Sequence, residues 1–383
     1  MDKETMTNVL ILKFPYDSAY GGGEKHTISL VRGLISQDFN FYLASSCPVL
    51  LREFKKRGWH NQKTWAGFEP VSKWSAIVFP LLAPLTFPKL ACTVFYYRFF
   101  KQVRIIYCLS LTEKLLIAFW AKLLGVRVFW TEHTTIDRWL TKNPWRWLYV
   151  WHSRLVTVVP ISQAIKNQLL EIGVKEKNIK VIYPGIDLGK IDIVRRNFER
   201  RFKKSFIIGT ICRLEPEKGI EYLMQATKRA LPLIPNISLI IVGDGGARKN
   251  LEWLAKKLEI DQVTQFVGFQ HNIEKWYPLF DLFALPSAIR ESFGISLVEA
   301  LAFEVPVVAS QMGGVTEIIE EKETGYLVPP KNSDALSEKI IYIYKNYQEA
   351  RQAAKRGRLK VEKMFSLDLM VEEYYKLLFR KKQ

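Results

Sequence analysis

Two glutamates stand in an unusual setting in the stretch "RESFGISLVEALAF", residues 290–303. Glu291 and Glu299 are eight residues apart, and an apolar run surrounds the second. Carboxylates are rarely fully buried without a partner, because the loss of hydration is costly. Their oxygens accept hydrogen bonds, so hydroxyl groups of a ligand would satisfy them. We therefore expect this stretch to bind a ligand.

The residues around the first glutamate suit an anion. The stretch "LFALPSAIRESFG" predicts a strand, a loop and a helix that begins near Gly294. The amides of Phe293, Gly294 and Ile295 at such a helix start would form a site for a diphosphate. Glu291 would then accept hydrogen bonds from sugar hydroxyls, and Glu299, about one turn into the helix, from a ribose diol.

A second loop carries positive charge. The stretch "GTICRLEPEKG" places Arg213 and Lys218 just beyond a predicted strand, in a loop that Gly219 closes. A planar guanidinium and a compact ammonium together suit two phosphates, although basic residues in loops are often merely solvated. "IIVGDGG" runs from a strand into a glycine turn, which permits close approach of a ligand or simply makes a tight turn.

Alternating strands and helices must position these loops. Strands are expected at 8–14, 40–46, 103–110, 126–133 and 154–162, and helices at 22–37, 112–125 and 163–173. The alternation restarts with strands at 206–214, 237–245, 263–269, 282–287 and 305–310, separated by helices at 218–231, 248–260 and 296–303. This order predicts two doubly wound α/β domains with parallel sheets and a linker at 186–204. Ligands of such sheets bind at the carboxyl ends of the strands, here in a cleft between the domains.

The positive charge is concentrated in the first half of the chain. Residues 1–200 contain 29 Lys and Arg against 15 Asp and Glu, while residues 201–383 contain 27 against 23. A basic half indicates an anionic partner such as a membrane surface, a nucleic acid or a phosphorylated substrate, or it serves solubility alone.

One segment interrupts the alternation. Residues 74–100, "WSAIVFPLLAPLTFPKLACTVFYYRFF", carry only Lys89 and Arg98 as charges and are flanked by basic residues. Pro80, Pro84 and Pro88 are expected to interrupt a membrane-spanning helix. Three interpretations remain open: an element lying in a membrane interface, a partly buried helix pair covering the first sheet and, in third place, a membrane-spanning helix.

The cysteines and the first residues indicate a reduced compartment. The four cysteines are far apart and form no CxxC pair, so neither a disulfide framework nor a zinc site is expected. "MDKETMTNVLILKFP" has mixed charge and too short an apolar run for a secretory signal peptide. We expect a cytoplasmic protein.

At this point the motifs resemble a known family. "ESFGISLVE" resembles the E-x7-E signature of glycosyltransferase family 4, retaining enzymes of the GT-B fold. "GGGEKH", "TEH", "YPGID", "CRLEPEKG", "IIVGDGG", "VGF" and "VVASQMGGVTEII" occur in that family's order and spacing, so the resemblance covers nearly the whole chain. It implies two Rossmann-like domains facing across a cleft: 1–185 plus 366–383 for the acceptor, and 205–365 for the nucleotide-sugar donor.

The resemblance also implies a role for individual residues. In the second domain, Arg213 and Lys218 would bind the donor diphosphate, with the amides of Phe293 and Gly294 at the distal phosphate. Glu299 would bind the ribose, Glu291 the transferred sugar, and Gly268 and Phe269 would lie beside the base. In the first domain, Gly22 and Gly23 would let a helix start approach the phosphates. His133 would lie near the anomeric carbon and assist the reaction, and Asp17 is a second possible helper. His26 would either face the acceptor or cap its loop.

The implied reaction is hexosyl transfer from a UDP- or GDP-sugar with retention. No D-x-D motif occurs in the sequence, and the family typically works without a metal, so we expect neither a metal nor a cofactor. The donor phosphate itself would accept the acceptor's proton. The basic, apolar first half favours a glycan or lipid-linked saccharide as acceptor, and peripheral contact of segment 74–100 with the inner face of the membrane.

Two alternatives belong to other classes. A nucleotide-sugar epimerase of the same architecture would not need an acceptor-binding half. A nucleic-acid-binding protein would explain the net charge of +18, but the aromatic residues do not interleave with basic ones in an RNA-recognition pattern, so we expect no nucleic acid. We expect a monomer, because no coiled-coil repeat is present.

Overall fold

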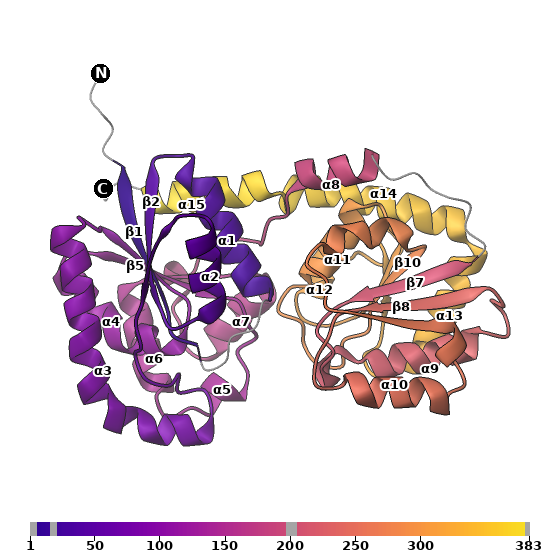
Figure 1. The fold of residues 1–383 in the computed structure, drawn as a ribbon, viewed down its shortest axis with the longest axis horizontal. Helices are drawn as coiled ribbons and strands as arrows, with labels where there is room; N and C mark the ends of the chain where they lie inside the picture. Colours follow the sequence, from indigo (N-terminus) through magenta and orange to yellow (C-terminus); the bar gives the residue numbers. More distant parts are fainter. Residues whose placement is uncertain (1–5, 16–20, 197–204, 380–383) are drawn as a thin grey trace. The chain divides into compact units, whose positions relative to one another are not determined.

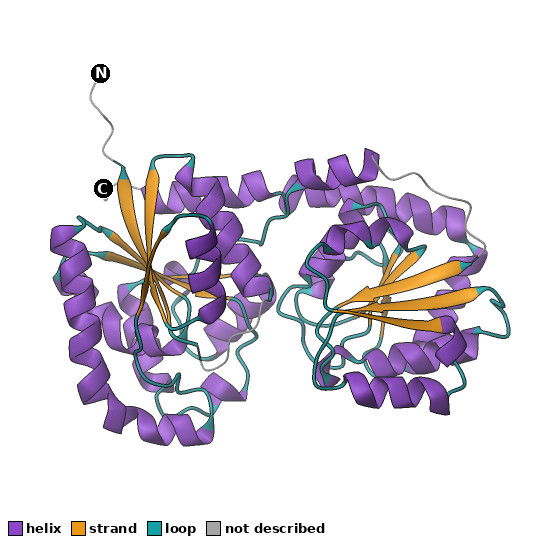
Figure 2. Cartoon of the chain, in the orientation of Figure 1, coloured by secondary structure: helices purple, strands orange, loops and turns teal. Residues whose placement is uncertain are grey.

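The computed structural model describes residues 6–15, 21–196 and 205–379, and these form two compact units (Figure 1). Unit 1 comprises residues 1–185 and 367–383, and unit 2 comprises residues 186–366. In each unit, helices flank a central sheet on both faces (Figure 2).

Unit 1 is built on a six-stranded sheet in which every strand pairs in parallel, with the order β3-β2-β1-β4-β5-β6. Its strands are β1 (Thr7–Lys13), β2 (Phe39–Ser45), β3 (His60–Lys63), β4 (Ile105–Cys108), β5 (Arg127–Glu132) and β6 (Thr157–Pro160). Central strands such as β1 and β4 consist mainly of buried apolar residues, as expected for a parallel sheet covered on both faces.

The helices of unit 1 form two layers. They are α1 (Gly22–Ile35), α2 (Pro48–Lys56), α3 (Lys73–Phe100), α4 (Leu111–Leu123), α5 (Arg138–Thr141), α6 (Arg146–His152), α7 (Gln163–Glu171) and α15 (Leu367–Phe379). One face of the sheet packs against α1, α2 and α15 in a single apolar cluster. On the other face α4 packs between α3 and α6.

Unit 2 repeats the architecture with the strand order β12-β11-β10-β7-β8-β9, again all parallel. Its strands are β7 (Phe206–Ile211), β8 (Ile237–Val242), β9 (Thr264–Gly268), β10 (Leu282–Leu285), β11 (Val307–Ser310) and β12 (Tyr326–Val328). Its helices are α8 (Leu188–Arg196), α9 (Ile220–Ala230), α10 (Arg248–Lys257), α11 (Ile295–Ala302), α12 (Val315–Ile318), α13 (Ser333–Lys345) and α14 (Tyr347–Met364). Helices α9, α10 and α13 share one core with the sheet.

Segment 74–100 is one continuous helix, α3, so the predictions of a proline interruption and of a helix pair were wrong. Proline removes the hydrogen bond to the carbonyl four residues earlier. For Pro80 that carbonyl belongs to Ala76, and it accepts a hydrogen bond from the indole Nε1 of Trp145 at 2.8 Å. A partner from another element thus replaces one bond that the helix cannot make.

The joint between the units also differs from the predicted linker. Helix α8 occupies residues 188–196 of the expected 186–204 linker and belongs to unit 2, where its Asp192 accepts from Arg358 of α14 at 3.1 Å. Residues 197–204 lie outside the described residues. The backbone amide of Ile186 donates to the carbonyl of Phe365 at 2.9 Å, so the two ends of unit 2 lie side by side.

Candidate active site

The loops that follow the strands of unit 2 contact each other through glycines. Gly219 has a φ of 62°, and a Cβ there would lie 2.2 Å from the carbonyl oxygen of Pro286. A Cβ on Gly314 would lie 2.6 Å from the carbonyl oxygen of Ser292. Only glycine allows such approaches. The loop after β7 and the loop after β11 therefore both pack against the backbone of residues 286–292, where Glu291 lies.

Lys218 and Glu291, predicted from separate motifs, form a direct ion pair. The Nζ of Lys218 lies 2.7 Å from Oε1 of Glu291, and the hydroxyl of Ser287 donates to the same oxygen at 2.5 Å. The two side chains are only 19% and 13% exposed. The sequence predicted ligand hydroxyls as the partners of Glu291, and that stays a prediction; within the protein, a lysine and a serine bind its Oε1. The partners leave Oε2 of Glu291 with no hydrogen bond to any described residue.

Glu299 also has a partner in the protein. The buried hydroxyl of Tyr277 donates to its Oε2 at 2.6 Å. Burial and the adjacent carboxylate raise the pKa of Tyr277 well above its usual range, so the phenol remains a donor. Glu299 lies on α11, which begins after Gly294, a residue with a φ of 107°. The left-handed glycine reverses the chain so that the loop carrying Glu291 leads directly into the helix carrying Glu299.

The remaining predicted residues of unit 2 differ in accessibility. The ring of Phe293 is buried against Phe365 at a centroid distance of 5.3 Å, so this side chain belongs to the core and only its backbone can face a ligand. The Arg213 side chain is 56% exposed and lies 3.4 Å from Glu217. Phe269 is half exposed beside Gly268 and packs its ring edge-on against His271.

In unit 1 the two predicted histidines contact each other. Nε2 of His133, just after β5, lies 3.0 Å from Nδ1 of His26 on α1. Burial lowers the pKa of His26 to about 4, and burial and His26 lower the pKa of His133 well below its usual range. The pair is therefore neutral near pH 7, with one ring donating and the other accepting. A Cβ on Gly23 would lie 3.4 Å from the ring of His133, which is an ordinary contact distance, so the predicted role of Gly23 stays a prediction.

The carboxylate of Glu24 caps the start of α1 and forms an ion pair there. Gly21 precedes Gly22, the first residue of the helix, and its amide donates to Glu24 at 3.1 Å. The ammonium of Lys13, at the end of β1, pairs with the other oxygen of Glu24. Asp17 lies outside the described residues.

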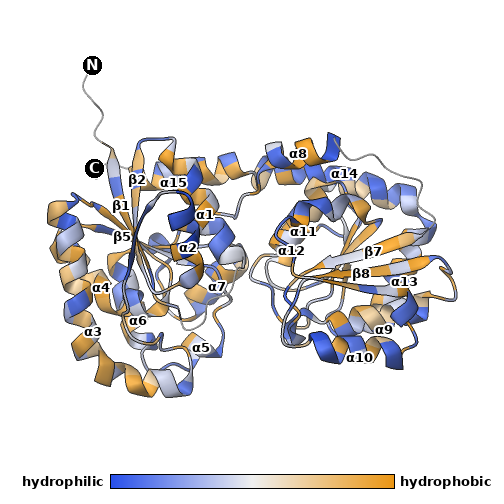
Figure 3. Cartoon of the chain, viewed as in Figure 1, coloured by the Kyte–Doolittle hydropathy of each residue, from blue (hydrophilic) through white to orange (hydrophobic). Residues whose placement is uncertain are grey.

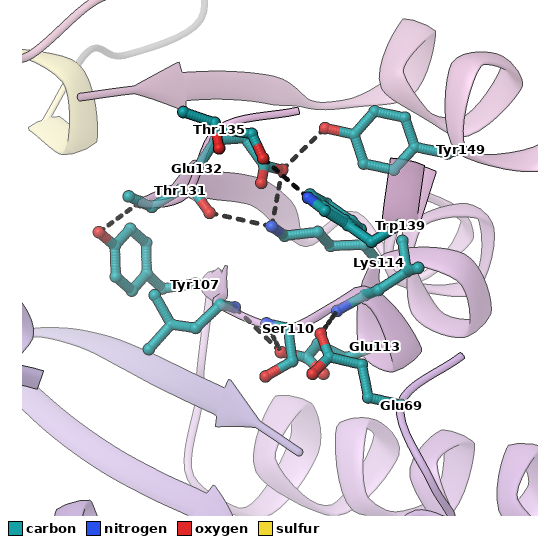
Figure 4. Close-up of polar contacts among 12 residues, drawn as sticks. Glu69, Tyr107, Ser110, Glu113, Lys114, Thr131, Glu132, Thr135, Trp139 and Tyr149 are labelled. Atoms are coloured by element: carbon teal, nitrogen blue, oxygen red, sulfur yellow. Dashed lines mark hydrogen bonds and ion pairs between the residues drawn. The ribbon is translucent and has the colours of Figure 1, made fainter. Parts of the chain in front are cut away.

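A buried charged network around Glu132, the residue before His133, was not predicted (Figure 4). The ammonium of Lys114 on α4 lies 2.6 Å from Oε1 of Glu132 and donates to the carbonyl of Thr131 at 2.9 Å. The hydroxyl of Tyr149 donates to the same Glu132 oxygen at 2.7 Å, and burial beside that carboxylate raises its pKa well above the usual range. Because Glu132 directly precedes His133, this network fixes the backbone that carries the histidine. Its signal in the sequence is a lysine inside the apolar run "TEKLLIAFW".

The start of α4 holds two further carboxyl groups. Oε1 of Glu113 accepts from the amide of Leu109 at 2.9 Å and from Ser110, and Glu69 accepts from the amide of Leu111 at 2.6 Å. Burial raises the pKa of Glu113 to about 8, and Glu69 adds to the effect. Glu113 is therefore mostly a neutral acid near pH 7. Within the described residues, no three His, Cys, Asp or Glu side chains are grouped as metal ligands would be.

Two family models together match most of the chain. Residues 20–190 match the model described as Glycosyltransferase Family 4, and residues 194–360 match the model described as Glycosyl transferases group 1. An uncharacterized glycosyltransferase of Methanocaldococcus jannaschii is 31% identical over 228 residues, which are 56% of this chain and 58% of the relative. The N-acetyl-alpha-D-glucosaminyl L-malate synthase of Bacillus anthracis is 28% identical over 221 residues, 57% of this chain and 58% of that protein. The chain thus matches less than two thirds of the length of these relatives.

Solved structures are similar over the full length. HepE of Anabaena, crystallised in complex with UDP, aligns with a TM-score of 0.79 at 21% identity, covering 98% of this chain and 100% of HepE. A glycosyltransferase of Rickettsia africae aligns with a TM-score of 0.80 at 21% identity, covering 98% and 99%. These similarities and the two parallel sheets show the predicted two-domain GT-B fold. The chain therefore belongs to glycosyltransferase family 4, and its second half is a group 1 glycosyl transferase domain.

Proposed function

We propose that this protein transfers a hexosyl group from a nucleoside-diphosphate sugar to a glycan or lipid-linked saccharide. The observation that carries the proposal is the Lys218–Glu291 pair at the carboxyl ends of strands of the second sheet, where the loop of Glu291 leads into α11 with Glu299. It offers a cation for phosphate from the loop after β7, and two carboxylates for hydroxyls from the loop after β10 and from α11. Among the structural neighbours, HepE was crystallised with UDP and with UDP-glucose, which supports a nucleotide-sugar donor.

The donor would divide its contacts among these residues. Lys218 and the exposed Arg213 would neutralise the diphosphate, with the amides of Phe293 and Gly294 beside it. Glu299 would bind the ribose while Tyr277 holds one of its oxygens, and Glu291 would bind the transferred sugar. The half-exposed ring of Phe269, next to Gly268, offers a face for the base. The base, uracil or guanine, is part of what the experiment below decides.

We further propose that the transfer retains configuration and needs no metal. The main service of the protein would be to stabilise the charge on the departing diphosphate. The donor phosphate would accept the acceptor's proton as the acceptor hydroxyl attacks the same face. His133 would lie near the anomeric carbon, and its depressed pKa makes it a neutral hydrogen-bond partner there and not a cation. His26, bonded to His133, would orient that ring.

The acceptor half would contact a membrane from the cytoplasmic side. Helix α3 is long and apolar enough by composition to span a bilayer, yet it packs along α4. Its outward residues include Leu81, which is 74% exposed, together with Ile77, Leu85 and Phe100. Figure 3 shows apolar residues along the length of α3. An exposed apolar face of this size supports peripheral contact at the interface.

A thermal-shift screen against UDP, GDP, ADP and their common sugars, with EDTA present, tests the donor site. We expect one nucleotide to raise the melting temperature and the Glu299→Gln variant to lose most of that shift. Glu338→Gln, which changes an exposed glutamate on α13, is the matched control and should keep the shift. If no nucleotide stabilises the protein, the proposed function is wrong.

The epimerase and nucleic-acid alternatives gain no support from the comparisons, which give glycosyltransferases. Conversion of a nucleotide sugar without any acceptor would favour the epimerase.

A further inference from the structure

A groove of about 770 Å³ lies on the surface of unit 1, between the α5–α6 turn and the far end of α6. Three cations line it: Lys142, Arg146 and Arg154. Two tryptophans line it as well, Trp147 and Trp151, which are 64% and 42% exposed. No carboxylate is among the lining residues. The donor and acceptor residues discussed above do not contribute to this groove.

The three cations of the groove are not neutralised by any carboxylate of the described part of the chain. Within the described ranges, none of the three pairs with a carboxylate, and Arg146 donates to the carbonyl of Ile172 at 3.3 Å. Residues 73–154 contain 12 Lys and Arg but only three acidic residues, and two of these, Glu113 and Glu132, are buried. The groove therefore presents a positive field to solvent, which favours an anionic ligand.

The walls of the groove are held in place before any ligand arrives. The amide group of Asn143, in the α5–α6 turn, donates to the carbonyl of Pro70 at 2.5 Å and to that of Trp139 at 2.9 Å. Its oxygen accepts from the amide of Trp145 at 2.9 Å. Trp145 in turn bonds to Ala76 of α3. The turn is already tied to the segment before α3 and to α3 itself. Little conformational entropy is therefore lost when a ligand binds.

Aromatic rings connect the groove to the apolar face of α3. The ring of Trp151 lies 5.9 Å from Phe119 on α4, and Phe119 lies 6.5 Å from Trp120. Trp120 lies 5.7 Å from Phe87 on α3. Trp151, Phe119 and Trp120 are exposed, so partly exposed rings run without interruption from the basic groove to the helix. Exposed tryptophans beside cations are the composition of a surface that enters the headgroup layer.

We propose that this groove binds the phosphate groups of anionic phospholipids while the exposed rings of α4, α6 and the face of α3 enter the headgroup layer. Three cations around a groove would take phosphate oxygens, and the two tryptophans would lie at the level of the glycerol backbone. The inference rests on the proposed membrane contact and gives that contact a lipid preference. It assigns the groove a ligand that is neither donor nor acceptor.

Vesicle flotation tests the proposal with the full-length protein. One set of vesicles contains phosphatidylcholine alone, and the other also contains phosphatidylglycerol. The groove variant carries Lys142→Gln, Arg146→Gln and Arg154→Gln. The control carries Lys249→Gln, Lys256→Gln and Lys355→Gln, which remove the same charge from exposed positions of unit 2. We expect the groove variant to bind anionic vesicles more than about tenfold more weakly than the wild type, since one cation near an anionic surface contributes about fivefold. The control should bind nearly as the wild type does.

Several outcomes would overturn the proposal. Equal binding of the wild type to both vesicle types would show that the groove has no preference for anionic lipid. Equal losses in the groove and control variants would mean that net charge alone acts. If the groove variant kept its vesicle binding but lost binding to RNA, the ligand of the groove would be nucleic acid and not lipid.

The nucleotide thermal shift, measured on the same proteins, separates this inference from the proposed function. If the groove variant keeps both its nucleotide shift and its vesicle binding, only the assignment of anionic lipid to the groove is refuted. A wild type that shows the nucleotide shift but never floats refutes the membrane contact and the groove with it, and leaves the proposed donor site standing.

Discussion

At the scale of single residues, the Lys218–Glu291 pair allows a direct test of the donor site. The variant Lys218→Gln should lower kcat by about 10² or more, the usual effect of removing one group that stabilises charge in the transition state. Lys228→Gln is the matched control, because Lys228 pairs with Glu259 on the surface. Transfer is measured as release of the nucleoside diphosphate. Equal kcat values for the two variants would contradict the assignment of Lys218.

A second residue-scale prediction concerns how the free energy of unfolding changes as the pH falls. His26 has a pKa of about 4 in the folded protein against 6.5 for an unperturbed histidine, so the unfolded chain binds its proton first as the pH falls. Stability contributed by the neutral ring is thus present above pH 6.5 and is lost as the pH falls toward 4. Between about pH 7.5 and about pH 5 the loss from this one group should be about 2 kcal/mol.

The measurement compares urea unfolding of the wild type and of His26→Gln at both pH values. Nine of the 11 tryptophans lie in unit 1, so tryptophan fluorescence reports mainly on the unit that contains His26. The variant should lose less stability than the wild type on acidification, whatever its stability at neutral pH. An unchanged pH dependence would mean that His26 is not buried in its neutral form.

At the scale of elements, α3 depends on a partner outside the helix. Replacing Trp145 with phenylalanine keeps a ring near Phe79, 5.6 Å away, but removes the donor to the Ala76 carbonyl that Pro80 leaves without its helical bond. An unsatisfied buried acceptor should cost about 1–3 kcal/mol. Trp147→Phe, at an exposed position, is the control. Urea unfolding followed by fluorescence should show a lower midpoint for Trp145→Phe only. Hydrogen exchange, measured separately, should be faster in α3 of that variant.

The same helix shows which elements sequence patterns can and cannot predict. The strands around Leu10, Ile106 and Ile208 were predicted because long buried aliphatic runs have few alternatives. The rule that proline interrupts a helix failed for α3, because the compensating donor, Trp145, lies 69 residues from Ala76 along the chain. Short elements such as β3 carry no apolar signal: all four of its residues are exposed.

The candidate site follows the same division. Lys218, Glu291 and Glu299 were predicted because family motifs mark them, but their partners Ser287 and Tyr277 were not, since nothing in the spacing places them. The contact between His26 and His133 joins positions 107 residues apart. The Lys114–Glu132 pair was missed because charges inside an apolar run have no periodic pattern that signals a partner.

At the scale of the whole molecule, unit 1 is completed by the last helix. Tyr374 of α15 is fully buried, its hydroxyl lies 3.1 Å from that of Tyr107, and its ring lies 5.7 Å from His26. Tyr374→Ala should therefore destabilise unit 1 by about 3–5 kcal/mol, the usual cost of deleting a large buried ring. Hydrogen exchange should rise in β1, β4 and β5.

Unit 2 should be unaffected by this change, because its core is separate. The nucleotide-induced thermal shift should persist in Tyr374→Ala, and exchange in β7 and β8 should stay at the wild-type level. Lys376→Ala, on the exposed face of the same helix, is the control and should change neither unit. Loss of nucleotide binding in Tyr374→Ala would show that the two cores are not independent.

The return of α15 to unit 1 also sets the order of events during synthesis. A ribosome releases all of unit 2 before it releases Val371 and Tyr374, which close the core of unit 1. The 181 residues from 186 to 366 take roughly 10–35 s to translate at ordinary elongation rates. Throughout that interval the apolar surfaces of α1 and β4 that α15 covers stay open on the nascent chain. The first domain to be made is therefore the last to finish folding, and it is the one that chaperones would have to protect.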